Sequence, residues 1–417
     1  MGIRCEWARL EGTGLSVEEW EAAIRKADAA GDAVRNAGFA TALDDEANTS
    51  GLPDQTPLDR VVVLGIGGSA LGARCVHDAT RTAAHRPLEV VDNIDPEAFE
   101  RVWANGDPKR TAWVVVSKSG GTTETLAQCS LVLEREPKAP LFIVTGPTGT
   151  LREIVETHGT PSWTVPEEVG GRFSVFTPAN TIALALAGHD VAALLDGARA
   201  MRDHCATAGS ASARLAGLLT ASELKGRNVV ALWAYAERLE ALGEWFRQLW
   251  AESLGKVRAD GTRVGQTPVH CVGSTDQHSI QQLLVEGPRD KVALVLGGPP
   301  TGDATAPAGR PGAGSGHALA DILTAMRRAT SAGMVRAGSP LATFKVESWG
   351  ERDIGALLML FLAATVQAGA ILEVDPYGQP GVESAKLDTK QLLAEPDGAA
   401  SLEIGGILGE DAGSVVP

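Results

Sequence analysis

Short apolar runs that alternate with stretches of helical character recur along most of this chain, and they constrain its fold more than any other feature. A first series lies at 61–64, 88–91, 113–116 and 141–144, and a second at 229–233, 269–272, 291–296 and 341–346. Continuous apolar strands that alternate with helices are typical of parallel sheets covered on both faces. The sequence therefore predicts an α/β fold with two tandem doubly wound parallel sheets, each in a three-layer α/β/α arrangement.

The length of 417 residues is more than one compact core usually holds, which agrees with two units. We expect a polar helical segment over 1–57, a first unit with a helical connection over 58–224, a second unit over 225–394 and a C-terminal tail over 395–417. Residues 356–372 carry no charged side chain, yet they fall short of the roughly 20 apolar residues that span a bilayer. We expect this stretch to be a buried helix of a soluble domain, and no membrane partner.

The charge balance and the cysteines limit the partners and the compartment. A formal net charge of -15, from 37 basic and 52 acidic side chains, disfavours nucleic acid and anionic membranes as partners. It still allows a small anionic substrate, because backbone N–H groups and one or two cations can hold a phosphate. Five dispersed cysteines predict reduced thiols in the cytoplasm, and no spacing of possible ligands indicates a metal site.

A glycine-rich loop, 65–72, follows the first predicted strand and precedes a helix. Such a loop can cradle a phosphate, because glycines let the backbone approach an anion and the helix N-terminus supplies N–H groups. Its glycines and Ala70 also fit the dinucleotide fingerprint, with Asp92 at the spacing of a ribose-binding acid. Taken alone, the loop favours NAD over a sugar phosphate, and a tight turn with Ser69 as a helix cap is a third interpretation.

A second loop, 116–125, also links a strand to a helix and contains five hydroxyls, two glycines and a lysine. This is a dense set of donors for the three oxygens of a phosphate. A capping box, with Glu124 reaching back to a Ser or Thr cap, is the structural alternative, and we expect capping in addition to phosphate binding. A dehydrogenase does not need such a group of hydroxyls at this strand, so the second loop favours a phosphate ligand.

Four further residues could carry chemistry, each with a structural alternative of similar or greater weight. Arg172 follows two glycines and could stabilise an oxyanion, or it could lie on a surface turn. Glu252 shares a helical stripe with apolar residues, and a partly desolvated carboxylate suits a general base, although a solvated last-turn position is the commoner case. His278 lies in a strand-to-helix loop, where it could move a proton or be structural. Lys386 alone indicates only a lysine on a helix that follows a turn.

Together these segments resemble the glucose-6-phosphate isomerase family over roughly 61–393. The matching segments are, in order, GIGGS, SKSGGTTET, GGRFS, QLWAESLGK, STDQHS with QQLLVEGPRDK, and QPGVESAK. The resemblance replaces the NAD interpretation of the first loop with a sugar phosphate. It implies two sugar-isomerase (SIS) domains, a hexose 6-phosphate substrate, no cofactor and no metal. It also implies a homodimer whose active sites are shared between subunits.

The resemblance also assigns roles to residues of this chain. Glu252 would be the base that moves a proton between C2 and C1 through a cis-enediol, and Arg172 would stabilise the enediolate. His278, oriented by Glu124 and supplied by the neighbouring subunit, would act in ring opening, with Lys386 assisting at the ring oxygen. The implied substrate-binding residues are Gly68, Ser69, Ser117, the backbone of Lys118, Ser119, Thr122 and Gln379.

Three departures from the family pattern leave the particular hexose open. The family usually has a glutamate where this chain has Leu362 and an aspartate where it has Gly378, and residues 177–181 also differ. We expect interconversion of glucose 6-phosphate and fructose 6-phosphate, as in glycolysis and gluconeogenesis, with mannose 6-phosphate as a further possible substrate. A sugar-phosphate sensor without turnover and an NAD-dependent dehydrogenase are the alternatives from other classes.

Overall fold

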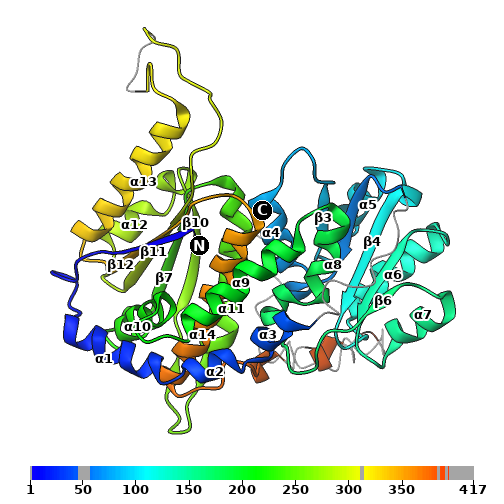
Figure 1. The fold of residues 1–417 in the computed structure, drawn as a ribbon, viewed down its shortest axis with the longest axis horizontal. Coiled ribbons are helices and arrows are strands. Elements are labelled where there is room, and N and C mark those ends of the chain that lie inside the picture. The colour runs from blue at the N-terminus through cyan, green and yellow to red at the C-terminus, as the bar shows by residue number, and fades with distance from the viewer. Residues whose placement is uncertain (1, 46–56, 310–313, 383–385, 390–392, 394–417) are drawn as a thin grey trace, which may run out of the picture. The chain divides into compact units, whose positions relative to one another are not determined.

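A computed structural model describes residues 2–45, 57–309, 314–382, 386–389 and 393 of the chain. Its contacts divide the chain into two compact units, Met1–Pro376 and Tyr377–Pro417. The first unit contains two five-stranded sheets with helices packed around them (Figure 1).

The first sheet consists of five parallel strands in the order β3-β2-β4-β5-β6. The strands are β2 (Arg60–Leu64), β3 (Leu88–Val91), β4 (Thr111–Ser117), β5 (Leu141–Thr145) and β6 (Ser162–Trp163). The chain passes from β2 to β3 on one side and then crosses to β4 on the other, so the order reverses between β2 and β4. In open α/β sheets, ligands bind outside the carboxyl ends of the strands at such a switch point.

The second sheet has the order β1-β12-β11-β7-β10, and all its pairs are parallel except β1 with β12. Its strands are β1 (Ile3–Trp7), β7 (Val229–Ala234), β10 (Thr267–Val272), β11 (Lys291–Gly297) and β12 (Leu341–Val346). The same reversal of order occurs here between β7 and β11. A separate antiparallel pair joins β8 (Lys256–Val257) to β9 (Arg263–Val264). All eight apolar runs predicted from the sequence lie in strands, which confirms the α/β fold class.

Fourteen α-helices have assigned bounds in the described part of the chain. They are α1 (Val17–Asp28), α2 (Gly31–Arg35), α3 (Gly38–Thr41), α4 (Leu71–Thr80), α5 (Pro96–Ala104), α6 (Thr123–Arg135), α7 (Thr150–His158), α8 (Pro178–Ala187), α9 (Val191–Cys205), α10 (Ala211–Glu223), α11 (Glu240–Leu254), α12 (Gln281–Glu286), α13 (Leu319–Arg336) and α14 (Glu351–Leu372). Short 3₁₀ turns add η3 (Gly67–Ser69), η5 (Gly171–Phe176) and η7 (Thr275–His278) near the predicted site residues.

Each sheet is covered on both faces, because alternate side chains of a strand point to opposite sides. In β2, Val62 and Leu64 pack with α5, α6 and α7, whereas Val61 and Val63 join a large core with α4 and α8. In β7, Trp233 packs with α12 and α13, while the neighbouring Leu232 faces that same large core. This core also contains α9, α10, α11 and α14, so one helical layer lies between the two sheets (Figure 1).

Two elements bear on the predictions from sequence. The segment 1–57, predicted as helical, begins instead with strand β1, which pairs with β12 at the edge of the second sheet. Helix α14 contains the apolar stretch 356–372, and all of that stretch is buried except Ala370, as predicted. Among the described residues α14 is the one helix long and apolar enough to cross a membrane, and 94% of its most apolar window is buried within the protein.

Candidate active site

Two of the predicted loops follow β2 and β4, and therefore lie at the switch point of the first sheet. The first contains the 3₁₀ turn η3, in which Gly67 has a positive φ of 55°. Ser69 lies within this turn, and the N-cap of α4 is Ala70, which makes no side-chain cap. The interpretation of Ser69 as a helix cap is therefore wrong, because the chain turns once more before the helix begins.

The first loop touches the loop that carries Arg172. A Cβ on Gly68 would lie 2.1 Å from the carbonyl oxygen of Gly171 and 2.6 Å from the amide nitrogen of Arg172. A Cβ on Gly67 would lie 2.8 Å from the side-chain amide of Gln248, on helix α11. Only glycine permits such close backbone approach, so the glycines of this loop bring β2, η5 and α11 together.

Asn180 joins the first loop to η5, although sequence analysis did not identify it. Its side chain is fully buried, and its Oδ1 accepts a hydrogen bond from the amide of Ala73 at 2.8 Å. Its Nδ2 donates to the carbonyl of Gly68 at 3.2 Å and to that of Ser174 at 3.0 Å. The only signal in the sequence was that 177–181 departs from the family pattern, and that signal gave no role. We class Asn180 as a positioning residue.

The second loop contains the hydroxyls predicted to hold phosphate. The Ser117 hydroxyl lies 2.8 Å from that of Thr122 and 3.4 Å from that of Ser119, and the amide of Gly121 donates to Ser119 at 3.3 Å. Thr122 is the N-cap of α6 but makes no capping hydrogen bond with its side chain. The predicted capping is therefore absent at this helix, because Thr122 pairs with Ser117. The three hydroxyls form one cluster beside a helix N-terminus, where an anion is stabilised.

Lys118 does not direct its ammonium group into this cluster. Its Nζ donates to the backbone carbonyl oxygens of Glu167 and Val169, the latter at 3.0 Å. This corrects the expectation that the lysine adds to the donors for phosphate. The side chain instead ties the second loop to the segment just before Gly170.

Arg172 and Glu252 form an ion pair beside the first loop. Arg172 Nη1 lies 3.4 Å from Glu252 Oε2, Nε donates to the Ser253 hydroxyl at 2.7 Å, and Nη2 donates to the carbonyl of Pro376 at 2.5 Å. The Arg172 side chain is 1% exposed and that of Glu252 29%. Burial lowers the pKa of Arg172, while the charges of Glu252 and Asp375 oppose this shift. The guanidinium is fixed in place, and the carboxylate is shielded but reachable.

His278 and Glu124 are not linked to this pair in the described part of the chain. His278 ends η7 after β10 and is exposed, and Glu124 lies in the first turn of α6. Within the part of the chain that the structure describes, no hydrogen bond or ion pair links His278 to Glu124, Glu252 or Arg172. Gln379 and Lys386 belong to the unit that begins at Tyr377, so their part in the site stays a prediction.

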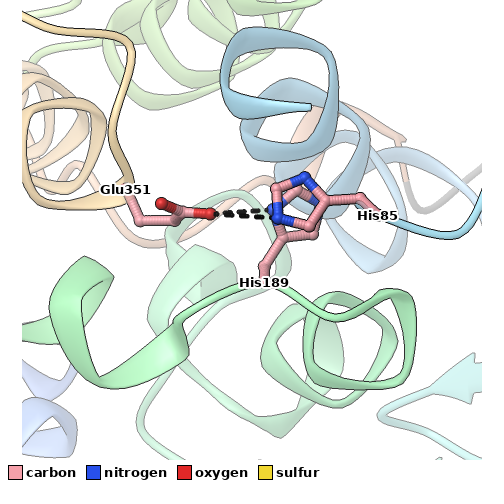
Figure 2. A group of neighbouring side chains, drawn as sticks. All are labelled: His85, His189 and Glu351. Atoms are coloured by element: carbon pink, nitrogen blue, oxygen red, sulfur yellow. Dashed lines mark hydrogen bonds and ion pairs between the residues drawn. The ribbon is translucent and has the colours of Figure 1, made fainter. Parts of the chain in front are cut away.

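A separate cluster places His85, His189 and Glu351 close together, and each could offer a ligand atom to a metal (Figure 2). Glu351 Oε1 lies 3.0 Å from His189 Nδ1 and 3.9 Å from His85 Nε2, and the two rings are 4.0 Å apart between centroids. The spacing of these residues along the chain gave no sign of this cluster, and no metal site was expected.

Both histidines of this cluster have hydrogen-bond partners within the protein. The amide of Thr82 donates to His85 Nδ1, so the proton of the neutral ring is on Nε2, facing Glu351. The hydroxyl of Thr80 donates to a helical carbonyl, so it accepts from His189 Nδ1. A metal-binding histidine presents a lone pair to the ion and donates its other N–H, which is the opposite arrangement. We therefore interpret the cluster as a hydrogen-bonded junction between the end of α4, the loop before α9 and the start of α14.

Comparison with known proteins agrees with this geometry. The family model for phosphoglucose isomerase matches residues 50–292. The glucose-6-phosphate isomerase of Rubrobacter xylanophilus is 36% identical over 367 residues, covering 80% of this chain and 82% of the relative, and that of Thermus thermophilus is 36% identical over 346 residues, covering 80% and 83%. A solved glucose-6-phosphate isomerase from Chlamydia trachomatis has the same fold, with a TM-score of 0.80 at 19% identity and coverage of 98% of this chain and 92% of that one. The chain therefore belongs to the phosphoglucose isomerase family.

Proposed function

We propose that this protein catalyses the reversible isomerisation of glucose 6-phosphate and fructose 6-phosphate. The observation that carries the proposal is the buried Arg172 guanidinium fixed against the half-shielded Glu252 carboxylate, next to the glycine loop of the first switch point. Family membership and the names of the relatives support the same reaction.

The reaction requires a base and a fixed positive charge. Glu252 takes the proton from C2 of the open-chain aldose, and protonation of O1 gives the cis-enediol. The O2 hydroxyl then loses a proton as Glu252 returns its own to C1, which gives the ketose. The developing enediolate oxygen is stabilised by Arg172, which hydrogen bonds to Ser253, Glu252 and Pro376 hold in place without reorganisation during the reaction. Since one proton passes from C2 to C1 and one from O2 to O1, the overall reaction is redox neutral and needs no external electron acceptor.

The substrate's phosphate is held by the hydroxyl cluster of Ser117, Ser119 and Thr122, with the backbone of Lys118. Support comes from the mutual hydrogen bonds of these hydroxyls and from the uncapped N-terminus of α6 beside them. Gly68, Ser69 and Gln379 contact the sugar. The first loop lies between Glu252 and the hydroxyl cluster. A Cβ at Gly65 would lie 3.3 Å from the carbonyl of Val116, and a Cβ at Gly67 would lie 2.8 Å from the side-chain amide of Gln248, which donates to Glu252 at 3.4 Å.

Ring opening is assigned to His278 of the neighbouring subunit, with Glu124 as its orienting carboxylate and Lys386 at the ring oxygen. The support for a shared site is that His278 is exposed and makes no contact with Glu124 within its own chain as described. We therefore propose a homodimer in which each site is completed by the partner.

The compartment and the domain division are also proposals. The cytoplasm is supported by five free cysteines, four of them buried, and burial raises the pKa of Cys129 to about 11. We propose 58–224 and 225–394 as the two sugar-isomerase domains, flanked by 1–57 and 395–417. The strand β1 modifies this division, because it adds part of the first segment to the second sheet.

The substitution Glu252→Gln tests the base. We expect turnover in a coupled assay from fructose 6-phosphate to fall by roughly 10²–10⁴-fold, while the sugar phosphate still binds. The matched control is Glu240→Gln, an exposed glutamate on the same helix, which should retain turnover. Near-normal turnover in the Glu252 variant would rule out this residue as the base.

An assay of the purified wild-type protein distinguishes a sugar-phosphate sensor from an isomerase. A sensor would bind fructose 6-phosphate without converting it, whereas an isomerase releases glucose 6-phosphate. A panel of hexose 6-phosphates that includes mannose 6-phosphate would show which sugars are converted.

A further inference from the structure

The second sheet has its own switch point, between β7 and β11, and a cavity lies at this switch point. A cavity of about 340 Å³ lies there, lined by residues that directly follow β7, residues that directly follow β11 and the first turns of α13. The corresponding place in the first sheet, after β2 and β4, carries the proposed isomerase site. Ligands of doubly wound sheets bind at this position, so the second hollow is where such a fold would hold another ligand.

The lining of this hollow is cationic. Arg81, Arg238 and Arg327 line it with a single carboxylate, that of Glu237. Arg81 pairs with Asp78 at 2.9 Å, and Arg238 donates to the carbonyl of Ala79 and stacks on Trp349, its guanidinium carbon 4.9 Å from the ring centre. These contacts fix both arginines. Asp78 balances the charge of Arg81, whereas the contacts of Arg238 are with neutral groups.

Arg327 is the unusual member of this set. Within the described residues, its guanidinium makes no hydrogen bond or ion pair, although the residue is half-buried. It packs against the last residue of β11, because a Cβ at Gly297 would lie 3.5 Å from its Nε. Burial and the neighbouring Arg328 lower the pKa of Arg327, while the charges of Glu6 and Tyr235 oppose this shift. A half-buried guanidinium is normally paired, so an unpaired one beside a cavity indicates a missing anion.

A second hollow, of about 230 Å³, is also lined by Arg327 and is also cationic. Arg4, Arg328 and Lys345 line it, again with one carboxylate, that of Glu6. None of these four side chains forms an ion pair in the part of the chain that the structure describes. Together the two hollows contain six cationic side chains and two carboxylates, in a chain whose net charge is -15.

We propose that this paired hollow binds a small metabolite with at least two phosphate groups, one in each hollow. Phosphate oxygens match the forked donors of arginine, and a ligand with two such groups accounts for two adjacent cationic hollows that share one guanidinium. The site is separate from the proposed isomerase site and does not depend on that activity. It makes the second switch point a ligand site in its own right.

The test is calorimetric titration of the full chain with inorganic pyrophosphate, with inorganic phosphate and sulfate as the comparison anions. We expect pyrophosphate to bind more tightly than either comparison anion, with an affinity that falls as salt rises. Arg327→Gln should weaken this binding about tenfold or more, because it removes a charged hydrogen-bond donor. Arg328→Gln, an exposed change in the second hollow alone, should weaken it less. The control Arg101→Gln, an exposed arginine on α5, should leave it unchanged.

Three results would overturn the proposal. One is the absence of pyrophosphate binding to the wild-type protein at millimolar concentration. Another is binding that is equal in the wild-type and Arg327→Gln proteins but lost in Ser119→Ala, which would place the anion on the hydroxyl cluster instead. The third is a change in sedimentation of Arg327→Gln without any change in pyrophosphate affinity, which would make the hollow a contact between copies. If Arg327→Gln does not fold by circular dichroism, Arg328→Gln decides the question.

Discussion

The substitution Asn180→Ala should damage both stability and turnover, because one amide group holds the two loops on which the proposed site depends. Its Oδ1 is the acceptor for the amide of Ala73, which lies in the first turn of α4 and therefore has no partner within its helix. Its Nδ2 holds the carbonyls of Gly68 and Ser174. The side chain is fully buried, so water cannot easily replace it.

The size of the expected loss in stability depends on which hydrogen bonds the former partners of Asn180 keep in the variant. The Gly68 carbonyl, at 3.1 Å, still shares the Ser174 hydroxyl proton with the Gly171 carbonyl, at 2.6 Å. The Ser174 carbonyl still accepts from the Thr177 hydroxyl at 2.8 Å. Only the Ala73 amide is left buried without an acceptor, which costs about 1–3 kcal/mol. The space left by the amide adds about 1 kcal/mol, so we expect a loss of roughly 2–4 kcal/mol in the free energy of unfolding.

Urea denaturation and steady-state kinetics measure the two effects. Turnover should fall by about tenfold to a hundredfold, because Gly68 is packed against the Arg172 backbone and a shift of about 1 Å there misplaces the guanidinium. The control Asn36→Ala, at an exposed position after α2, should change stability by less than about 0.5 kcal/mol. The reasoning fails if the free energy of unfolding of Asn180→Ala lies within about 1 kcal/mol of the wild-type value and turnover is unchanged.

Two further predictions concern groups whose partners the structure identifies. Lys118→Met should reduce the free energy of unfolding by about 1–3 kcal/mol and raise KM only modestly, because Nζ donates to the carbonyls of Glu167 and Val169. A rise in KM of more than about a hundredfold at unchanged stability would mean that the ammonium group binds phosphate directly. Burial, followed by the charge of His189, lowers the pKa of His77 from 6.5 to about 4. Between pH 6.5 and about 4, His77 is protonated in the unfolded chain but stays neutral in the folded protein. The free energy of unfolding should therefore keep its full value above pH 6.5 and fall by about 3 kcal/mol as the pH approaches 4. Urea titrations across this range should show a flatter profile for His77→Gln, and an unchanged slope would contradict the assignment.

The parallel strands could be predicted from the sequence because each is a continuous apolar run, buried on both faces. The strand β1 could not, because its five residues alternate between half-buried and exposed and its partner β12 lies at the other end of the first unit. Its pattern is that of an edge strand, which a short polar segment does not reveal by itself.

Site residues that are close together in the sequence could likewise be predicted, whereas those whose partners lie far along the chain were missed. Ser117, Ser119 and Thr122 lie within six positions of one loop, so their meeting could be anticipated from spacing alone. Arg172 and Glu252 were each identified, yet only the fold shows that they form an ion pair. Asn180 and Lys118 act on backbone atoms far along the chain, and backbone partners leave no mark in a sequence.

The two switch points follow the same rule. At the first, the proposed ligand-binding groups come from loops directly after β2 and β4, and their glycines and hydroxyls form contiguous motifs. At the second, the cations come from the end of α4, the turn after β7, and α13, and so no motif exists to be recognised. Two sheets with the same strand order are expected to bind ligands at the same position, but the residues that bind them need not form similar sequence motifs. A duplicated sheet architecture can therefore hold a second ligand site whose chemistry becomes visible only when the charges of distant segments are placed side by side.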